Sequence, residues 1–209
     1  MRRSIFAKGR RLPLTAIGLC LALAGVAPAA HASDGTATVR NLYDTLMSAM
    51  RNGASLGASG RYQQIEPVVS RVFDVPLMAR LAVGSQWASL TASQRQQVTQ
   101  AFTRYIAAIY AERFDSYSGE RLQVTGVRPS AGGSIITSQI VKSNGEPVDI
   151  NYLMRNNGGI WQIADVYLDG TISELATRRS EFASILRSRG VEGLIQSLNT
   201  KAASLTRAS

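Results

Sequence analysis

Four side chains in the second half of the chain could perform acid–base chemistry. Asp149 and Asp165 are candidate general bases, and Tyr152 and Tyr167 are candidate donors to an oxyanion that develops on a substrate. Such a pairing of a carboxylate with a phenol would suit an isomerase or a dehydratase acting on a small molecule. All four residues fall within residues 149–173, so the elements of this stretch decide whether they can act together.

The stretch 149–173 is typical of two strands joined by a tight turn. Alternate positions from Val148 to Met154 are apolar, which is the period-two pattern of a half-buried strand. Asn156-Asn157-Gly158-Gly159 supplies residues that tolerate positive φ, so the chain can reverse there. The returning strand, residues 161–168, is almost continuously apolar or aromatic. A strand of this kind is covered on more than one side, either by the protein itself or by a ligand.

The first 32 residues have the pattern of an export signal. Five basic residues precede an apolar segment, residues 12–26, and Ala30-His31-Ala32 then forms an A-x-A cleavage site. The apolar segment is too short to span a membrane as a helix. We therefore predict cleavage after Ala32, localisation in the periplasm and a single mature domain over residues 33–209.

Cleavage would remove the only cysteine, Cys20, and the only histidine, His31. The mature chain then has no thiol nucleophile, no imidazole base and no histidine or cysteine that binds a metal, so we expect neither a metal nor a cofactor. The signal also holds five of the 23 basic residues and none of the 14 acidic ones, which leaves a net charge of +4. This modest charge predicts no nucleic-acid partner and only peripheral contact with membranes.

Apolar periodicity and turn residues outline the other elements. Helical spacing predicts helices over residues 36–50, 61–73, 77–83 and 92–117. Between them we expect a loop over residues 53–60, a kink at Pro67 and a capping box made by Thr91 and Gln94. A final helical pair meets at Gly190, and the tail after Lys201 is expected to fray.

Two more strands precede the hairpin. They are predicted over residues 121–127 and 135–142, with a loop at residues 129–133. With the hairpin they make four antiparallel strands. The predicted fold class is therefore α+β, in which helices pack on one face of a curved four-stranded antiparallel sheet.

Several short motifs, spread over residues 39–198, match one known family. In the first half these are the run Phe73-Asp74-Val75-Pro76-Leu77-Met78-Ala79-Arg80-Leu81, the pair Gly84 and Trp87, and Leu90-Thr91 with Gln94-Arg95. In the second half they are Phe114 with Tyr117-Ser118-Gly119, Gly159 with Trp161, Asp165-Val166 with Asp169-Gly170, and Arg179-Ser180 with Phe182. Each motif is weak alone, but the combination is specific. The chain resembles the MlaC family of periplasmic lipid-binding proteins, also described as the toluene-tolerance auxiliary component of an ABC transporter.

The resemblance implies both a fold and a function. The fold would be a nuclear-transport-factor-two-like sheet capped by helices, with an apolar pocket for lipid acyl chains between them. The protein would be a shuttle without catalytic activity, which carries phospholipid or a hopanoid between an inner-membrane lipid transporter and an outer-membrane complex. The run YLDGTISEL, residues 167–175, looks closest to the hopanoid-associated HpnM branch of the family.

Apolar side chains of these motifs, helices and strands are the candidate lipid-binding residues. They are Val75, Leu77, Met78, Leu81, Trp87, Phe102, Ile106, Tyr110, Phe114, Tyr152, Met154, Trp161, Val166 and Phe182. We expect Tyr110 and Phe114 to face Tyr152 and Met154 across the lipid. Any of these residues could instead fill an ordinary core, and Trp161 also suits a packing anchor.

Three alternatives stay open for the polar residues and for the function as a whole. Arg80, Arg178 and Arg179 could meet lipid phosphate or a membrane partner, or could form solvated salt bridges. The same sheet-and-helix fold could carry the acid–base enzyme described above, because fold alone does not define function. The apolar faces could also be filled, as in a protein that serves only as a scaffold.

Overall fold

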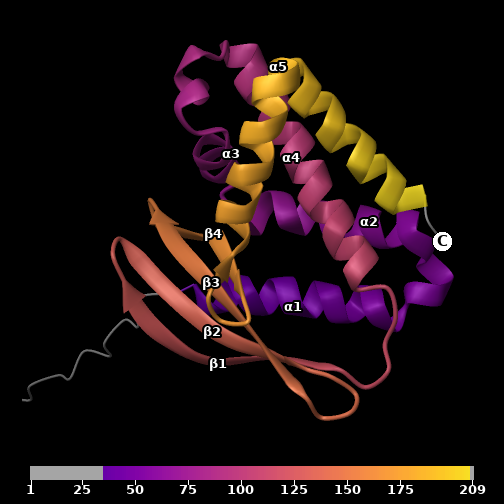
Figure 1. Cartoon of the computed structure of the whole chain (residues 1–209). Helices are drawn as coiled ribbons and strands as arrows, with labels where there is room; N and C mark the ends of the chain where they lie inside the picture. Colours follow the sequence, from indigo (N-terminus) through magenta and orange to yellow (C-terminus); the bar gives the residue numbers. More distant parts are fainter. Residues whose placement is uncertain (1–34, 208–209) are drawn as a thin grey trace, which may run out of the picture. The chain divides into compact units, whose positions relative to one another are not determined.

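An antiparallel sheet and a group of helices make up residues 35–207, the part of the chain that the computed structural model describes (Figure 1). These residues belong to one compact unit, Ala32–Ser209. The predicted export signal, its cleavage site at Ala32, and Cys20 and His31 lie outside the described residues.

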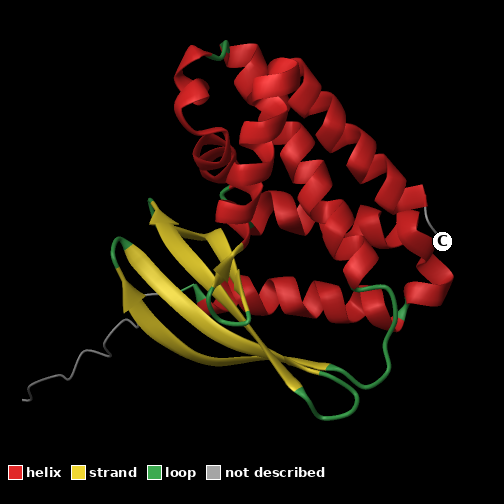
Figure 2. Ribbon diagram, viewed as in Figure 1, coloured by secondary structure: helices red, strands yellow, loops and turns green. Residues whose placement is uncertain are grey.

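The sheet is a simple meander in which each strand pairs with the next. Its order is β1-β2-β3-β4-β5, and all pairings are antiparallel. The strands are β1 (Arg121–Ser130), β2 (Gly133–Val141), β3 (Pro147–Asn157), β4 (Ile160–Leu168) and β5 (Ile172–Ser173). The predicted hairpin is confirmed as β3 and β4, and Gly158 and Gly159 both adopt positive φ in its turn (Figure 2).

The prediction of four strands is wrong, because the chain adds the short strand β5. Asp169 and Gly170 adopt φ values of 48° and 74°, and the amide of Thr171 donates to the carbonyl of Leu168 at 3.1 Å. This tight reversal places Ile172 opposite Leu168. A two-residue strand is too short to show a period-two pattern in the sequence.

The predicted loop at residues 129–133 is also wrong. Both strands continue through most of it, and Ala131-Gly132 alone makes the turn. Gly133 pairs with Arg155, and a Cβ at Gly133 would lie 1.9 Å from the carbonyl oxygen of Met154. Glycine is therefore required there by close strand contact, although glycine and proline in a sequence usually indicate a loop.

The helices are α1 (Thr36–Arg51), α2 (Gly53–Val72), α3 (Val75–Val83), the 3-10 helix η1 (Gly84–Ser89), α4 (Ala92–Arg113) and α5 (Glu174–Arg207). The capping box is confirmed, because the Gln94 amide donates to the Thr91 hydroxyl at 3.1 Å and the Thr91 amide donates to the Gln94 side chain at 3.0 Å. Helix α3 begins after the side-chain cap of Asp74 and ends at Gly84, where φ is 70°.

The sequence-based prediction of a loop at residues 53–60 is wrong, since α2 covers them. The helix is interrupted at Gly57 (φ 60°, ψ 178°), and not at Pro67 as predicted. Tertiary contacts stabilise the start of this helix. The buried Arg61 donates to the carbonyls of Gly53 and Ala111 at 3.2 and 2.9 Å, which connects the first turn of α2 with the end of α4 and satisfies an unpaired carbonyl there.

Helix α5 has the predicted break at Gly190, where φ is 65° and ψ is −169°. The expectation of a frayed tail after Lys201 is wrong, because α5 continues to Arg207. Ala202 is buried, Leu205 packs against the core, and Lys201 pairs with Glu181 on the first half of the same helix. These contacts hold the last turns in place.

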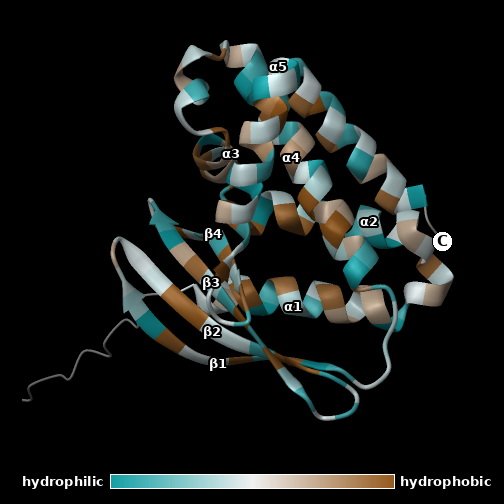
Figure 3. Cartoon of the chain, in the orientation of Figure 1, coloured by the Kyte–Doolittle hydropathy of each residue, from teal (hydrophilic) through white to brown (hydrophobic). Residues whose placement is uncertain are grey.

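The core lies between the sheet and the helices. Helix α1 packs on the sheet, where the Tyr43 and Tyr152 rings meet edge to face with centroids 5.9 Å apart. Hydrophobic residues recur along α1 and along the strands beside it (Figure 3). Helices α4 and α5 pack together through Phe102 and Phe182, whose centroids are 5.2 Å apart. No helix within residues 35–207 is long and apolar enough to cross a membrane.

Candidate functional site: an apolar cavity

A cavity of about 410 Å³ lies between α4, the beginning of α5 and one face of the sheet. Its apolar lining consists of Met50, Phe73, Met78, Phe102, Ile106, Ile109, Tyr110, Phe114, Ile140, Ile150, Tyr152, Val166, Leu168 and Leu175. Its polar lining consists of Arg113, Asp115, Ser116, Glu120, Glu174 and Arg178. A mainly apolar wall with polar groups gathered at a few places is typical of a site for a small apolar ligand.

One face of α4 forms the helical wall. Phe102, Ile106, Ile109, Tyr110 and Arg113 repeat at three- and four-residue spacing, which brings them to the same side of the helix. Most of these side chains are apolar. Arg113, in the last turn, is exposed, so this wall changes from apolar to charged where α4 ends.

Neighbouring strands form the opposite wall. Tyr152 pairs with Val166 and Ile150 pairs with Leu168 across β3 and β4, so these four side chains lie together on one face of the sheet. Ile140 of β2 extends the same surface. The polar side chains alternate to the other face, as Asp149 does.

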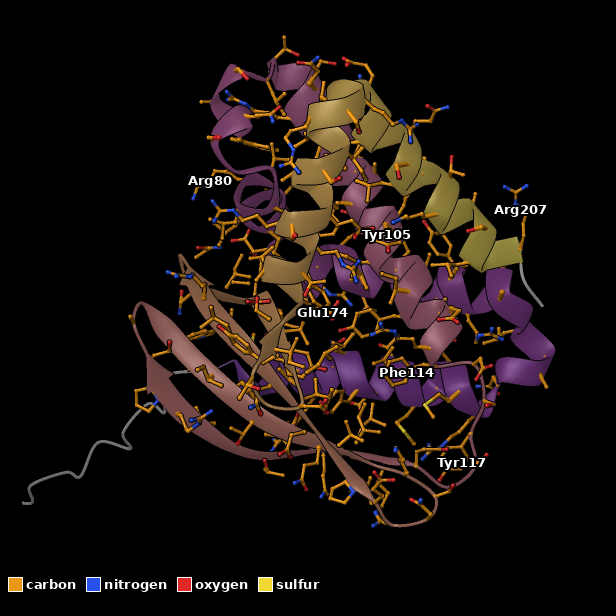
Figure 4. The ribbon with its side chains drawn as sticks, viewed as in Figure 1. Arg80, Tyr105, Phe114, Tyr117, Glu174 and Arg207 are labelled. Carbon is orange, nitrogen blue, oxygen red and sulfur yellow. The ribbon has the colours of Figure 1, made fainter. Side chains whose placement is uncertain are left out.

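Aromatic rings gather on the helical side of the cavity. Tyr110 stacks on Phe114 with ring centroids 5.7 Å apart and planes within 10°, and it also meets the tilted ring of Phe73 at 5.8 Å. Phe114 is the C-cap residue of α4, and Glu174 is the first residue of α5 (Figure 4). The ring of Phe114 therefore lines the cavity at the point where α4 ends and the α4–β1 loop begins.

Hydroxyl groups lie close together at the aromatic wall. The Tyr152 phenol lies beside those of Tyr110 and Tyr43, and the hydroxyl oxygens of Tyr43 and Ser138 are 2.5 Å apart. The Ser138 hydroxyl donates to the carbonyl of Ile150, so the Tyr43 hydroxyl donates to Ser138. The hydroxyl protons of Tyr43 and Ser138 are therefore both donated within the protein.

Burial changes the ionisation of these tyrosines. Desolvation raises the pKa of Tyr110, Tyr43 and Tyr152, and the neighbouring phenols raise that of Tyr152 further. The three phenols are therefore neutral at physiological pH, which keeps this wall free of charge.

Charged groups at the start of α5 are paired with one another. The Arg178 guanidinium contacts Glu174 at 2.9 Å and Glu181 at 2.8 Å, and it lies over the ring of Tyr105 with its central carbon 5.5 Å from the centroid. Burial acts to raise the pKa of Glu181, but hydrogen bonds from Lys201 and Arg178 outweigh it and hold that pKa below its usual value. At this side of the cavity, the positive charges of Arg178 and Lys201 are therefore balanced by the negative charges of Glu174 and Glu181.

Seven of the fourteen predicted site residues line the cavity. They are Met78, Phe102, Ile106, Tyr110, Phe114, Tyr152 and Val166. The other seven lie outside its lining: Val75, Met154 and Phe182 are buried in the core, Leu77, Trp87 and Trp161 are half-buried, and Leu81 is 43% exposed. The expectation that Met154 faces Tyr110 across the cavity is wrong, because Met154 packs against the beginning of α1 at Gly35.

Several lining residues were not predicted, although some of them had a detectable signal in the sequence. Ile150 and Leu168 lie two positions from Tyr152 and Val166 on the same strands, so period two could have found them. Ile109 lies three residues after Ile106 on α4. Glu120 and Met50 come from a loop and a helix end, which only the tertiary structure brings to the cavity.

The candidate acid–base residues do not meet in this cavity. The buried Asp165 carboxylate accepts hydrogen bonds from the amides of Val166 (2.7 Å) and Leu175 (3.0 Å) and from the hydroxyl of Ser173 (2.6 Å). Asp149 is exposed and accepts from Gln139 at 3.0 Å. Neither carboxylate lines the cavity with Tyr152. Within residues 35–207, no group of three or more His, Cys, Asp or Glu side chains is placed to hold a metal ion.

Fold and cavity together define an α+β protein with an apolar cavity between a meandering antiparallel sheet and its covering helices. The MlaC protein family model matches residues 40–200, and the chain belongs to this family. It is 26% identical over 125 residues to the intermembrane phospholipid transport system binding protein MlaC of Haemophilus influenzae. That alignment covers 57% of this chain and 58% of the relative, so the chain matches less than two thirds of the relative's length.

A solved structure has a similar fold. It is the phospholipid-binding protein from Ralstonia solanacearum in complex with a phospholipid, which is 25% identical to this chain and aligns with a TM-score of 0.68. The alignment covers 83% of this chain and 99% of that protein.

Proposed function

We propose that this protein is a lipid carrier that holds acyl chains in the apolar cavity and performs no chemistry on them. The observation that carries this proposal is the cavity of about 410 Å³ between α4 and the sheet, with its mainly apolar lining. Membership of the MlaC family and the two relatives, whose names describe phospholipid transport or binding, support it.

The energetics of lipid in water explain why such a carrier is needed. Burying one CH₂ group is worth about 0.8 kcal/mol, so a long acyl chain exposed to water costs on the order of 10 kcal/mol. Free diffusion of a lipid through an aqueous compartment is therefore negligible. The mainly apolar lining suits the cavity to hydrocarbon, because few polar groups have to be buried against the acyl chain.

We also propose a compartment, a ligand and partners for this carrier. The export pattern of residues 1–32 supports a mature protein in the periplasm, where it would carry phospholipid between an inner-membrane transporter and an outer-membrane complex. A hopanoid is the alternative ligand, suggested by the run at residues 167–175. The proposed lipid contacts are the apolar lining residues, above all Phe102, Ile106 and Tyr110.

Native mass spectrometry of gently purified protein, with analysis of the organic extract, tests the proposal. We expect the wild type to carry lipid. Ile109→Trp places a larger side chain in the cavity and should greatly reduce the lipid bound per chain. Ile195→Trp is the matched control, because Ile195 is also a half-buried isoleucine on a helix but packs outside the cavity. A wild-type mass equal to that of the bare polypeptide, or equal lipid loss in both variants, would contradict the proposal.

A further inference from the structure

A second hollow, of about 250 Å³, lies on the surface where α3, η1 and the first half of α5 meet. Its rim carries Arg179 and Arg187, which are eight residues apart and separated by the small Ala183. This spacing places the three residues on one face of α5. The hollow shares no lining residue with the apolar cavity.

The two arginines are available to a ligand. Both side chains are exposed, and within residues 35–207 neither guanidinium has a carboxylate or a hydrogen-bond acceptor as partner. The adjacent Arg178 differs, since it is held by Glu174 and Glu181. A guanidinium offers several N–H donors in one plane, an arrangement that matches the oxygens of a phosphate group.

Gly84 keeps the hollow open beneath one of these arginines. A Cβ at this position would lie 3.8 Å from Nε and 3.9 Å from Nη2 of Arg179, so any larger side chain would occupy the space next to the guanidinium. The φ of Gly84 is 70°, a conformation that L residues rarely adopt.

The helices α3 and η1 beside the hollow carry basic and apolar residues but no acidic ones. The sequence holds no Asp or Glu from residue 75 to residue 111, a range that covers α3, η1 and most of α4. Arg80 projects outward from α3 (Figure 4), and its neighbour Leu81 is 43% exposed. Basic residues beside an exposed apolar side chain are typical of a surface that binds anionic membranes.

We propose that this basic surface, formed by Arg80, Leu81, Gly84, Arg179 and Arg187, docks the protein on an anionic phospholipid bilayer. Arg179 and Arg187 bind headgroup phosphates, and Leu81 enters the interface. This docking role rests on the proposed function as a lipid carrier. Helices α3 and α5 also line the apolar cavity, through Met78 and Arg178, so docking here brings two cavity-forming elements to the membrane that supplies or receives the lipid.

Vesicle flotation at low salt tests the docking surface. The probes are vesicles of phosphatidylglycerol with phosphatidylcholine, and vesicles of phosphatidylcholine alone. We expect the wild type to float with the anionic vesicles only. Arg179→Gln/Arg187→Gln should weaken this binding by about 25-fold, because each of the two basic residues near an anionic surface contributes on the order of a factor of five. Leu81→Ser should weaken it by several-fold.

Matched controls come from β1. Arg121→Gln/Arg128→Gln removes the same charge from exposed positions, and Val127→Ser changes a residue that is 42% exposed, close to the 43% of Leu81. These variants should bind within about threefold of the wild type. Equal losses in the two arginine pairs would overturn the proposal, since binding would then follow net charge alone. A wild type that does not float with anionic vesicles would also overturn it and would favour an acidic protein partner.

The lipid content of the same preparations separates this proposal from the proposed function. The Arg179→Gln/Arg187→Gln variant should keep the wild-type amount of lipid per chain and the wild-type thermal transition, because its substitutions lie outside the cavity. Normal vesicle binding by a protein that never carries lipid would contradict the carrier function and leave the docking surface supported. A wild type that carries lipid but does not bind vesicles would support the carrier function and contradict the docking surface.

Discussion

Aromatic residues serve two different purposes in this protein. Phe182 has no exposed surface and packs edge to face on Phe102, as expected of a core residue. Phe114 is half-buried, stacks on Tyr110 and lines the cavity with part of its ring. Phenylalanine therefore fills the core at position 182 and lines the cavity at position 114.

Truncating these two phenylalanines should have different costs. In delipidated protein, Phe182→Ala should lower the free energy of unfolding by about 3–5 kcal/mol, because it removes core contacts and leaves a void. Phe114→Ala should cost about 1–2 kcal/mol, since one side of its ring already faces open space. Phe114→Ala should also change the amount of lipid per chain. Denaturant unfolding with lipid quantification measures both, and equal costs for the two variants would show that Phe114 belongs to the closed core.

Alkaline pH should destabilise the protein through its buried tyrosines. Burial raises the pKa of Tyr43, Tyr110 and Tyr152, so above about pH 10 the unfolded chain loses phenolic protons that the folded chain keeps. The stabilisation is therefore complete below pH 10 and declines above it, by about 1.4 kcal/mol per pH unit for each such tyrosine. Tyr152→Phe should remove the contribution of one proton from the slope of the unfolding free energy against pH. Phenolate absorbance of the folded protein measures the ionisation of its tyrosines. If all seven tyrosines ionised in one step near pH 10, the prediction would be contradicted.

At the scale of elements, the junction between β4 and α5 depends on one buried carboxylate. Asp165 accepts from the amide of Leu175 in the first turn of α5, and from the hydroxyl of Ser173, which in turn accepts from the amide of Ala176 at 2.9 Å. Two of the unpaired amides at the beginning of α5 are satisfied in this way. A negative charge at this position is also favourable to the helix dipole.

Asp165→Asn should therefore destabilise the fold without affecting lipid. We expect a loss of about 1–3 kcal/mol in the free energy of unfolding, because the charged acceptor is lost and an amide NH₂ must face groups that donate. Asp149→Asn, at an exposed position, should change stability by less than about 0.5 kcal/mol. Both variants should keep bound lipid. An enzymatic turnover that Asp165→Asn abolishes while stability stays at the wild-type level would favour the acid–base enzyme instead.

At the scale of the whole molecule, the export pattern predicts the mature chain. The protein recovered from the periplasm should begin at Ser33 and should need no detergent, because the A-x-A site ends at Ala32. Ala32→Arg should block processing, since cleavage requires a small residue there. Intact-mass measurement of the two proteins checks this, and a wild type that keeps residues 1–32 or is recovered only with membranes would contradict the prediction.

The sequence by itself determined the elements whose signals are local. The apolar spacing of α1 and α4, the capping box at Thr91, the turn glycines of the β3–β4 hairpin and the break at Gly190 all depend on near neighbours in the chain. The motifs also pointed to the MlaC family, which the family model confirms. The absence of histidine and cysteine after residue 32 is likewise a property of the sequence alone.

Two segments are helical because of contacts with distant residues, and only the tertiary structure shows these contacts. Residues 53–60 are small and polar, which indicates a loop, but α2 covers them because Arg61 connects Gly53 with the end of α4. The last turns after Lys201 are ordered by Glu181 and by core contacts. Local propensity is a weak influence when such contacts are available, so the prediction failed at these two segments.

Tertiary structure also decided which apolar residues face the cavity. Tyr152 and Met154 have the same position in the period-two pattern of β3, and the sequence therefore assigned both to the lipid site. A register shift lies between Leu153 and Met154, and beyond it the beginning of α1 covers the strand, where a Cβ at Gly35 would lie 2.9 Å from Cγ of Met154. Tyr152 lines the cavity, while Met154 has no exposed surface. The alternation of a strand selects a face, but the element packed against that face decides which part of it stays open.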